Sequence, residues 1–180
     1  MGESTPRIVV VSGLPGAGKS TTSRRLAGHL GPAAHVEADR LQEMIVAGGV
    51  WPEGRREMSP EAERQLRLRL GNACALARSF LQAGFSAVVD DIVIGSRMDD
   101  LLDDLDGIPF SFVMLMPDFE VVHRRWVEMS SPFAEVFGWI DDEIRQHTRR
   151  LGLWLDTSTL SAEQTVAAIL DRWDEAVVRP

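Results

Sequence analysis

The sequence predicts an α/β fold, a three-layer sandwich in which helices cover both faces of a mostly parallel sheet. Five short runs rich in apolar and β-branched residues alternate along the chain with segments of helical spacing, and this alternation is typical of parallel α/β sheets. The 180 residues contain no internal repeat or second compositional block. We therefore expect one domain over residues 1–180.

Each expected element has a local signal. The strands are expected at residues 7–13, 35–39, 85–92, 110–116 and 153–156, and the helices at 19–30, 40–47, 59–83, 96–105, 118–129 and 139–151, with a last helix from 161 that carries Val166, Ile169, Leu170, Trp173 and Val177 on one face. Ser59-Pro60-Glu61 offers a capping hydroxyl, a proline at the first helical position and an acid in the first turn. Ser161 and Gln164 have the spacing of a capping box. Ser130-Ser131-Pro132 interrupts the helical spacing.

Composition and charge narrow the classes of function. With 44% hydrophobic and 26% charged residues, the chain has the composition of an ordinary globular protein. No apolar run approaches the roughly 20 residues of a membrane span, and the N-terminus lacks a secretory-signal pattern, so we expect a cytoplasmic protein with no membrane partner. The formal net charge of −8 opposes general nucleic-acid binding, which needs Lys and Arg to neutralise phosphates.

The strongest motif follows the first expected strand. Residues 13–20, GLPGAGKS, match G-x-x-x-x-G-K-[ST] between a strand and a helix, the context that makes this pattern a phosphate-binding loop. Glycines let successive backbone N–H groups surround an anion, and the helix that follows presents its positive end. Lys19 is expected to reach the β- and γ-phosphates and Ser20 to ligate Mg²⁺. The candidate nucleotide-binding residues are Gly13, Leu14, Pro15, Gly16, Ala17, Gly18, Lys19, Ser20 and Thr21.

Two further strands are followed by acids at the edge of the sheet where α/β proteins bind ligands. Val88-Val89-Asp90-Asp91 resembles a Walker B strand, and we expect Asp90 near the metal and Asp91 toward the acceptor; the alternative is that one of the two caps the next turn. Asp39 is expected to close the second strand, where it could accept the proton of an attacking hydroxyl. Helix capping by Asp39 is the alternative.

Arginines cluster between the fourth and fifth strands, at about residues 124–150, and we expect this segment to form a lid. Guanidinium groups stabilise the charge that develops during phosphoryl transfer. The members are Arg124, Arg125, Arg145, Arg149 and Arg150, of which Arg125 and Arg145 are the catalytic candidates. The alternative is a solvated helix face, because the acids Asp141, Asp142 and Glu143 could pair with Arg145 and Arg149 at helical spacing.

A few aromatic and sulfur-containing residues have specific expectations. Trp51 and Trp139 occupy irregular or boundary positions and could line an acceptor pocket, whereas Trp154 and Trp173 fit core patterns. Cys74, the one cysteine, has apolar neighbours that favour a buried position over a reactive thiol. The four histidines have no metal-ligand spacing, and the sequence suggests no role for them.

The order of these motifs resembles that of the small P-loop kinases: phosphate loop, Asp39 strand, Val88-Val89-Asp90-Asp91 strand, arginine-bearing lid and Asp156-Thr157-Ser158. Within that group the chain is most similar to the chloramphenicol phosphotransferase and zeta-toxin-like branch. The resemblance implies a five-stranded parallel sheet in the order 2-3-1-4-5, ATP with Mg²⁺ as donor, a hydroxyl acceptor, Asp39 as base and lid arginines beside the donor phosphates. The expected acceptor loop, residues 46–59, matches no acceptor signature.

The sequence thus favours an ATP-dependent phosphotransferase that acts on a small hydroxylated molecule such as an antibiotic, a sugar or a nucleoside. A toxin-type kinase of a nucleotide sugar and a noncatalytic or NTPase nucleotide-binding module remain alternatives. A GTPase-like switch is disfavoured because no N-K-x-D motif occurs. A kinase of polynucleotide 5′-hydroxyls is disfavoured by the acidic balance.

Overall fold

The computed structural model describes residues 5–53, 57–128 and 138–179. Its strands are β1 (Ile8–Gly13), β2 (Ala33–Glu37), β3 (Ser86–Asp90), β4 (Phe110–Leu115), β5 (Leu153–Leu155) and β6 (Val177–Val178). Its helices are α1 (Lys19–Ala27), α2 (Ala38–Glu43), α3 (Pro60–Gln82), α4 (Arg97–Asp104), α5 (Phe119–Glu128), α7 (Gly138–Asp142), the π-helical turn η1 (Glu143–His147), α8 (Ala162–Asp171) and α9 (Trp173–Ala176). Part of the expected lid, residues 129–137 with Ser130-Ser131-Pro132, lies outside the described residues.

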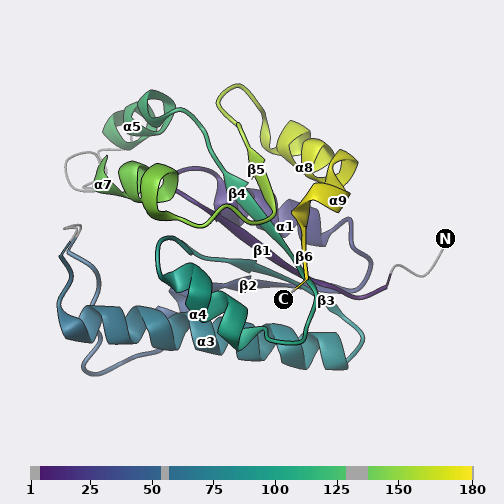
Figure 1. Cartoon of the computed structure of the whole chain (residues 1–180), viewed down its shortest axis with the longest axis horizontal. Helices are drawn as coiled ribbons and strands as arrows, with labels where there is room; N and C mark the ends of the chain where they lie inside the picture. The colour runs from purple at the N-terminus through teal and green to yellow at the C-terminus, as the bar shows by residue number, and fades with distance from the viewer. Residues whose placement is uncertain (1–4, 54–56, 129–137, 180) are drawn as a thin grey trace.

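The sheet has the order β2-β3-β1-β4-β5 with every neighbouring pair parallel, which confirms the predicted fold class. Helices α1 and α8 pack together, as do α3 and α4, and Figure 1 shows these two pairs on opposite sides of the sheet. The carboxyl ends of the strands point toward the side that carries α7 and the start of α3 (Figure 1). Ligand-binding segments are therefore expected on that side.

The central strands are apolar because both of their faces are covered. All residues of β1, β3 and β4 are buried, as a parallel sheet between two helical layers requires. Helix α3 contributes Leu70, Ala73 and Ala77, each fully buried. Cys74 is also buried, and burial raises the pKa of its thiol to about 12. The expectation of a buried cysteine rather than a reactive thiol is therefore confirmed.

Three expected elements were wrong in detail. The second strand ends at Glu37, and Asp39 lies in the first turn of α2. The helix expected at 139–151 ends at His147, and Thr148 has an extended backbone conformation. The last helix ends at Asp171 and is followed by the short helix α9 and by β6, which pairs antiparallel with β4.

Among the described residues, no helix combines the length and the apolar character of a membrane span.

Truncating a core side chain of α3 tests how far the fold depends on this helix. We predict that Leu70→Ala, at a fully buried position, lowers the free energy of unfolding by about 2–5 kcal/mol, because it removes apolar contacts and leaves a cavity. Leu68→Ala on the same helix is the control: this side chain is 43% exposed and its loss should change stability by less than about 0.5 kcal/mol. Urea denaturation followed by circular dichroism measures both, and equal effects would contradict the prediction.

Candidate active site

The phosphate loop connects β1 to α1 at the carboxyl edge of the sheet. Gly13 and Gly16 have φ of 146° and 78°, values that favour glycine. A Cβ at Gly13 would lie 2.6 Å from the Leu115 carbonyl oxygen, so β4 also excludes a side chain there. Lys19 Nζ donates to the Leu14 carbonyl oxygen at 3.0 Å, and burial lowers the pKa of this ammonium from its ordinary value.

Helix α5 supports the phosphate loop from outside. Trp126, which is 2% exposed, donates from Nε1 to the Pro15 carbonyl oxygen at 3.0 Å. Arg125 Nη1 donates to the Gly16 carbonyl oxygen at 3.2 Å. A Cβ on Gly16 would lie 2.7 Å from Trp126 Nε1, so the loop and the indole fit closely. Arg125 therefore lies beside the phosphate loop, and its contact with phosphate stays a prediction.

The two acids after β3 face different partners. Asp90 lies at the carboxyl end of β3 and its Oδ2 is 2.9 Å from His35 Nε2. Asp91 accepts a hydrogen bond from Arg69 and another from the Ile92 backbone N–H. The Asp91 carboxylate is held by Arg69, because α3 brings this guanidinium to the end of the sheet, and its place toward the acceptor stays a prediction.

Arg69 also binds Asp39, so one guanidinium joins two acids from separate elements. Arg69 Nη1 lies 2.9 Å from Asp39 Oδ1, and the arginine is buried while the Asp39 side chain is 67% exposed. The surrounding protein removes part of the water around the Asp39 carboxyl and raises its pKa, the Asp91 charge raises it further, and Arg69 lowers it. A carboxylate with a raised pKa thus lies at the site, held by a cation.

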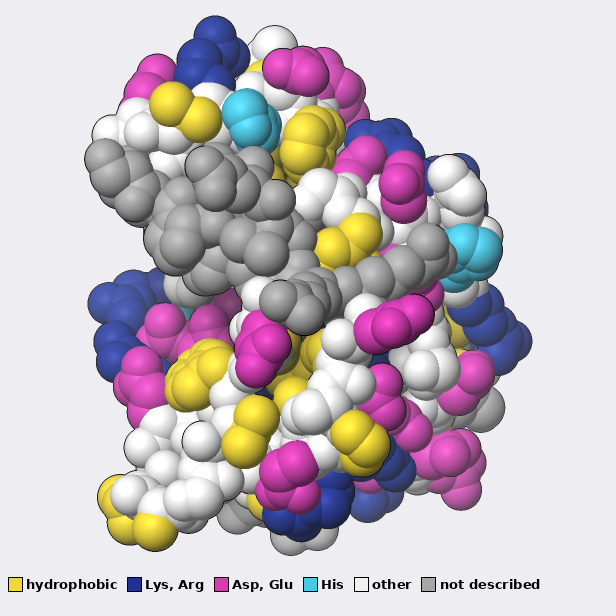
Figure 2. Space-filling view, turned by 90° about the vertical axis from the view of Figure 1, so that its left-hand side faces the viewer, with side chains coloured by type: hydrophobic (Ala, Val, Ile, Leu, Met, Phe, Trp, Pro, Cys, Tyr) yellow, Lys and Arg dark blue, Asp and Glu magenta, His cyan; other side chains and the backbone are white. Residues whose placement is uncertain are grey.

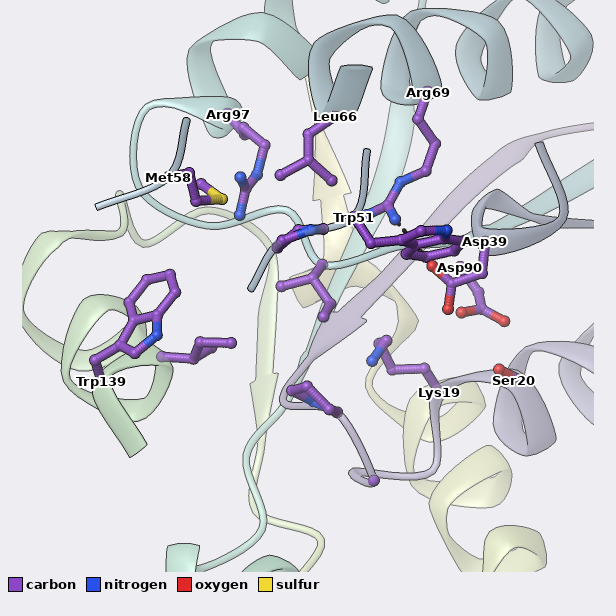
Figure 3. Close-up of a pocket in the computed structure, with 15 residues that line it drawn as sticks. Lys19, Ser20, Asp39, Trp51, Met58, Leu66, Arg69, Asp90, Arg97 and Trp139 are labelled. Carbon is purple, nitrogen blue, oxygen red and sulfur yellow. Dashed lines mark hydrogen bonds and ion pairs between the residues drawn. The ribbon is translucent and has the colours of Figure 1, made fainter. Parts of the chain in front are cut away.

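These groups surround a pocket of about 460 Å³. Figure 3 shows Lys19, Ser20, Asp39 and Asp90 toward one end of it and Arg97, Met58 and Trp139 toward the other. The pocket is lined by Pro15, Gly16, Lys19, Ser20, Asp39, Trp51, Pro52, Met58, Leu66, Arg69, Asp90, Ile92, Arg97, Trp139 and Ile140. The expectation that Trp51 and Trp139 line a pocket is confirmed. Figure 2 views the molecule from this end, where hydrophobic side chains gather among acidic ones.

A buried amide pair holds the loop that carries Trp51. Gln42 of α2 donates to Gln65 of α3 at 2.9 Å, and the Gln65 side chain donates to the Gly48 carbonyl oxygen and accepts from the Val50 N–H. Every donor and acceptor in this set comes from α2, α3 or the loop between them. The pocket wall is therefore fixed by the same two helices that position Asp39.

The donor set fits a magnesium ion. Ser20 and Asp90 line the pocket together, and Mg²⁺ is commonly held by one or two protein oxygens with substrate phosphates completing its coordination. Among the described residues, no group of three or more His, Cys, Asp or Glu side chains could hold a metal by itself.

Arg145 does not lie in this pocket. Its Nε is 2.8 Å from Asp141 Oδ2, which is the local pairing that the sequence offered as the alternative. It lines a separate hollow with Asp118, Arg150 and Asp156, and the Arg150 guanidinium lies 4.7 Å from the Trp154 ring centroid. Phosphate contact by Arg145 stays a prediction.

Sequence reasoning missed His35, Arg69 and Arg97. His35 pairs with Val88 in the sheet register, two residues from Asp90, so alternation places both side chains on one face; this signal was available. Arg69 falls inside the apolar face of α3 between Leu66 and Ala73, which is an unusual place for a charge. Arg97 had no such signal.

The contact between the phosphate loop and Trp126 can be tested by adding one methyl group. We predict that Gly16→Ala weakens ATP binding about 10-fold or more, because the backbone strain and the displaced indole together cost roughly 1–3 kcal/mol. Titration with a fluorescent ATP analogue measures the change. Gly84→Ala is the matched control: φ is 84° and no atom lies within 4 Å of the position that the new methyl group would take, so binding should persist. Unchanged affinity in Gly16→Ala would contradict the prediction.

Known proteins resemble this chain in sequence and in fold. A UPF0200 protein from Aeropyrum pernix is 38% identical over 87 residues, which make up 47% of this chain and 46% of that protein. The match thus spans less than half of the relative's length.

The solved structures that resemble the chain cover nearly all of it. The tunicamycin resistance protein of Deinococcus radiodurans has a TM-score of 0.68 and 19% identity, with 97% of this chain and 99% of that chain covered. A sugar kinase from Janibacter has a TM-score of 0.65 and 20% identity, with 95% and 96% covered, and the APS kinase of Mycobacterium tuberculosis has 0.65 and 18%, with 94% and 98% covered. At these identities the likeness establishes the fold alone, that of an α/β P-loop kinase. A family model described as AAA domain matches residues 8–128, more than half of the chain, and the protein belongs to this AAA-domain family.

Proposed function

We propose that the protein is an ATP-dependent phosphotransferase that moves the γ-phosphate of ATP to a hydroxyl group of a small molecule. The observation that carries this proposal is that Lys19, Ser20 and Asp39 line one pocket, which also has apolar and aromatic lining residues. A phosphate-binding loop alone would fit any nucleotide-binding protein. A carboxylate with a raised pKa beside that loop, next to space for a second molecule, favours transfer to an alcohol.

The transfer step uses each of these groups in turn. The acceptor hydroxyl gives its proton to the Asp39 carboxylate as its oxygen forms a bond to Pγ. The bond between Pγ and the β–γ bridging oxygen breaks, and ADP leaves with that oxygen. The Lys19 ammonium exchanges the Leu14 carbonyl oxygen for phosphate oxygens and stabilises the charge that develops on them.

The remaining residues would hold these groups in place. Ser20 and Asp90 would hold Mg²⁺, which neutralises charge on the donor phosphates when bound. His35 orients the Asp90 carboxylate, and Asp91 acts through Arg69, which positions Asp39. Arg125 and Arg145 are proposed to contact the donor phosphates, Arg125 from its place beside the loop.

The branch of the family and the kind of acceptor belong to the same proposal. The order of the motifs supports the chloramphenicol phosphotransferase and zeta-toxin-like branch, and a single domain over residues 1–180 with a lid at about 124–150. Among the proteins of similar fold, one is named a sugar kinase and another a gluconokinase, which supports polyhydroxylated acceptors, while the tunicamycin resistance protein supports an antibiotic.

Removing the ammonium of the phosphate loop tests the donor site. We predict that Lys19→Ala lowers ATP-dependent phosphorylation about 100-fold or more, because a preorganised charge at the transferring phosphate is lost. Acceptor phosphorylation with γ-labelled ATP, screened over antibiotics, nucleosides, sugars and nucleotide sugars, gives the measurement. Arg24→Ala, at an exposed position on the same helix, should retain wild-type turnover. Equal rates in Lys19→Ala and the wild-type protein would exclude the proposed donor site.

Removing the base tests the chemical step. We predict that Asp39→Asn keeps ATP affinity but slows transfer about 10²- to 10⁴-fold, the usual contribution of a general base. In the wild-type protein the rate should fall as the pH drops through the Asp39 pKa, which lies above that of an ordinary aspartate, because a protonated carboxyl cannot accept a proton.

The pH profile of single-turnover transfer separates this role from a structural one. Asp39→Asn should lack the acid limb, whereas Glu43→Gln, an exposed change on the same helix, should keep both the limb and the rate. An acid limb that survives in Asp39→Asn would assign the proton to another group.

A further inference from the structure

A partly buried arginine lies at the end of the pocket remote from the phosphate loop. Arg97 lies at the start of α4 and lines the pocket with Met58 and Trp139. The same three residues also line an adjoining hollow that includes none of Lys19, Ser20, Asp39 or Asp90. Figure 3 likewise shows the Arg97 guanidinium on the opposite side of the pocket from Lys19 and Ser20.

Arg97 differs from Lys19 and Arg69, which also line the pocket, in what it contacts. Lys19 is bonded to the Leu14 carbonyl oxygen, and Arg69 is bound by Asp39 and Asp91. For Arg97, the part of the chain that the structure describes provides no ion pair within 4 Å, and its buried Nε has no hydrogen-bond partner. Asp91, Asp100 and Glu143 act on it only at longer range.

A partly buried guanidinium whose Nε is shielded from water and unbonded, and which has no counter-ion, is energetically unfavourable. Burial lowers the pKa of Arg97 from its ordinary value, yet a guanidinium keeps its proton in proteins. Its planar group of N–H donors matches carboxylate and phosphate oxygens in pairs. An anion that enters the pocket would supply the missing charge and the missing hydrogen bonds together, whereas a neutral ligand would leave both unsatisfied.

Most of the other side chains that line the pocket are apolar or aromatic. They include Trp51, Leu66, Ile92, Trp139 and Ile140. A ligand that spans this region must therefore present apolar or aromatic surface along its length, because polar groups would lose hydrogen bonds with water there. Only its two ends would face charged protein groups.

Resting on the proposed function, we infer that the acceptor is an anionic molecule whose carboxylate or phosphate group binds Arg97 while its hydroxyl lies at Asp39, with an apolar or aromatic body between them. Arg97 is then the residue that selects charged acceptors over neutral ones. Neutral sugars and neutral antibiotics would be poor substrates, and hydroxy acids or nucleoside monophosphates would be good ones.

Equilibrium binding of matched pairs of probes tests this inference without turnover. Isothermal titration calorimetry is carried out on protein saturated with ADP and Mg²⁺, so that the phosphate loop is filled and cannot bind the probe anion. One pair is 4-hydroxyphenylacetate with its neutral analogue 2-(4-hydroxyphenyl)ethanol, and the other is AMP with adenosine. The first pair tests a carboxylate and the second a phosphate monoester.

We expect the anionic member of at least one pair to bind about 10- to 100-fold more tightly than its neutral partner, as a charge-assisted hydrogen-bond pair would give. Arg97→Met should abolish that difference, and Arg97→Lys should restore it in part because it keeps the charge but not the planar fork. Arg64→Met, an exposed α3 arginine paired with Glu61, should keep it. ADP affinity should be equal in all four proteins, which also verifies folding.

Three outcomes would overturn the inference: no preference for the anion in either pair, a preference that survives in Arg97→Met, or a loss of ADP affinity in an Arg97→Met protein whose circular dichroism spectrum and thermal unfolding match the wild type, which would place Arg97 at the donor site. Failure of the proposed function is distinguishable from these. It would appear as a preference for anions that depends on Arg97 in a protein that transfers no phosphate from ATP to any probe.

Discussion

The arrangement of the site depends on the ion pairs of Arg69. This guanidinium comes from α3 and is buried, and it binds Asp91 after β3 and Asp39 in α2. Three segments that are separate in the sequence are thereby held at one point. Removing Arg69 would leave the buried Asp91 carboxylate without its counter-charge, and breaking a buried pair in this way typically costs about 3–5 kcal/mol. Asp39 is otherwise open to the pocket, so its position depends on this contact more than on its own short helix.

Features that depend on residues close together in the sequence could be predicted, whereas features that depend on how the helices pack in space could not. The phosphate loop is a local motif, and the acids Asp90 and Asp91 follow from the rule that parallel strands carry ligands at their carboxyl ends. Arg69 and Arg97 lie on helices whose rotation and height above the sheet are set by tertiary contacts. Their place in the pocket therefore had no signal in local spacing, apart from the odd position of Arg69 on an apolar helix face.

The end of the chain shows a second limit of periodicity. Val166 and Ile169 are buried as the helical spacing predicted, but α8 stops at Asp171. Strand β5 covers β4 only from Val113 to Leu115, which leaves the first residues of β4 with an open edge. Val178 and Val177 pair with Phe110 and Ser111 there. Because β-branched valines suit a strand and an unpaired edge was available, strand pairing prevailed over a longer helix.

The contact between α5 and the phosphate loop explains how the loop can be ready for an anion before one arrives. Within a planar peptide unit the C=O and the N–H point in opposite directions. Trp126 binds the Pro15 carbonyl oxygen on the outer side of the loop, so the N–H of Gly16, in the same peptide unit, points away from α5. By binding the Pro15 carbonyl oxygen on the outer side of the loop, the Trp126 N–H thereby turns the Gly16 N–H toward the inner side. Arg125 of the same helix adds a positive charge at the Gly16 carbonyl oxygen, so any movement of α5 would act directly on the loop that is proposed to bind phosphate.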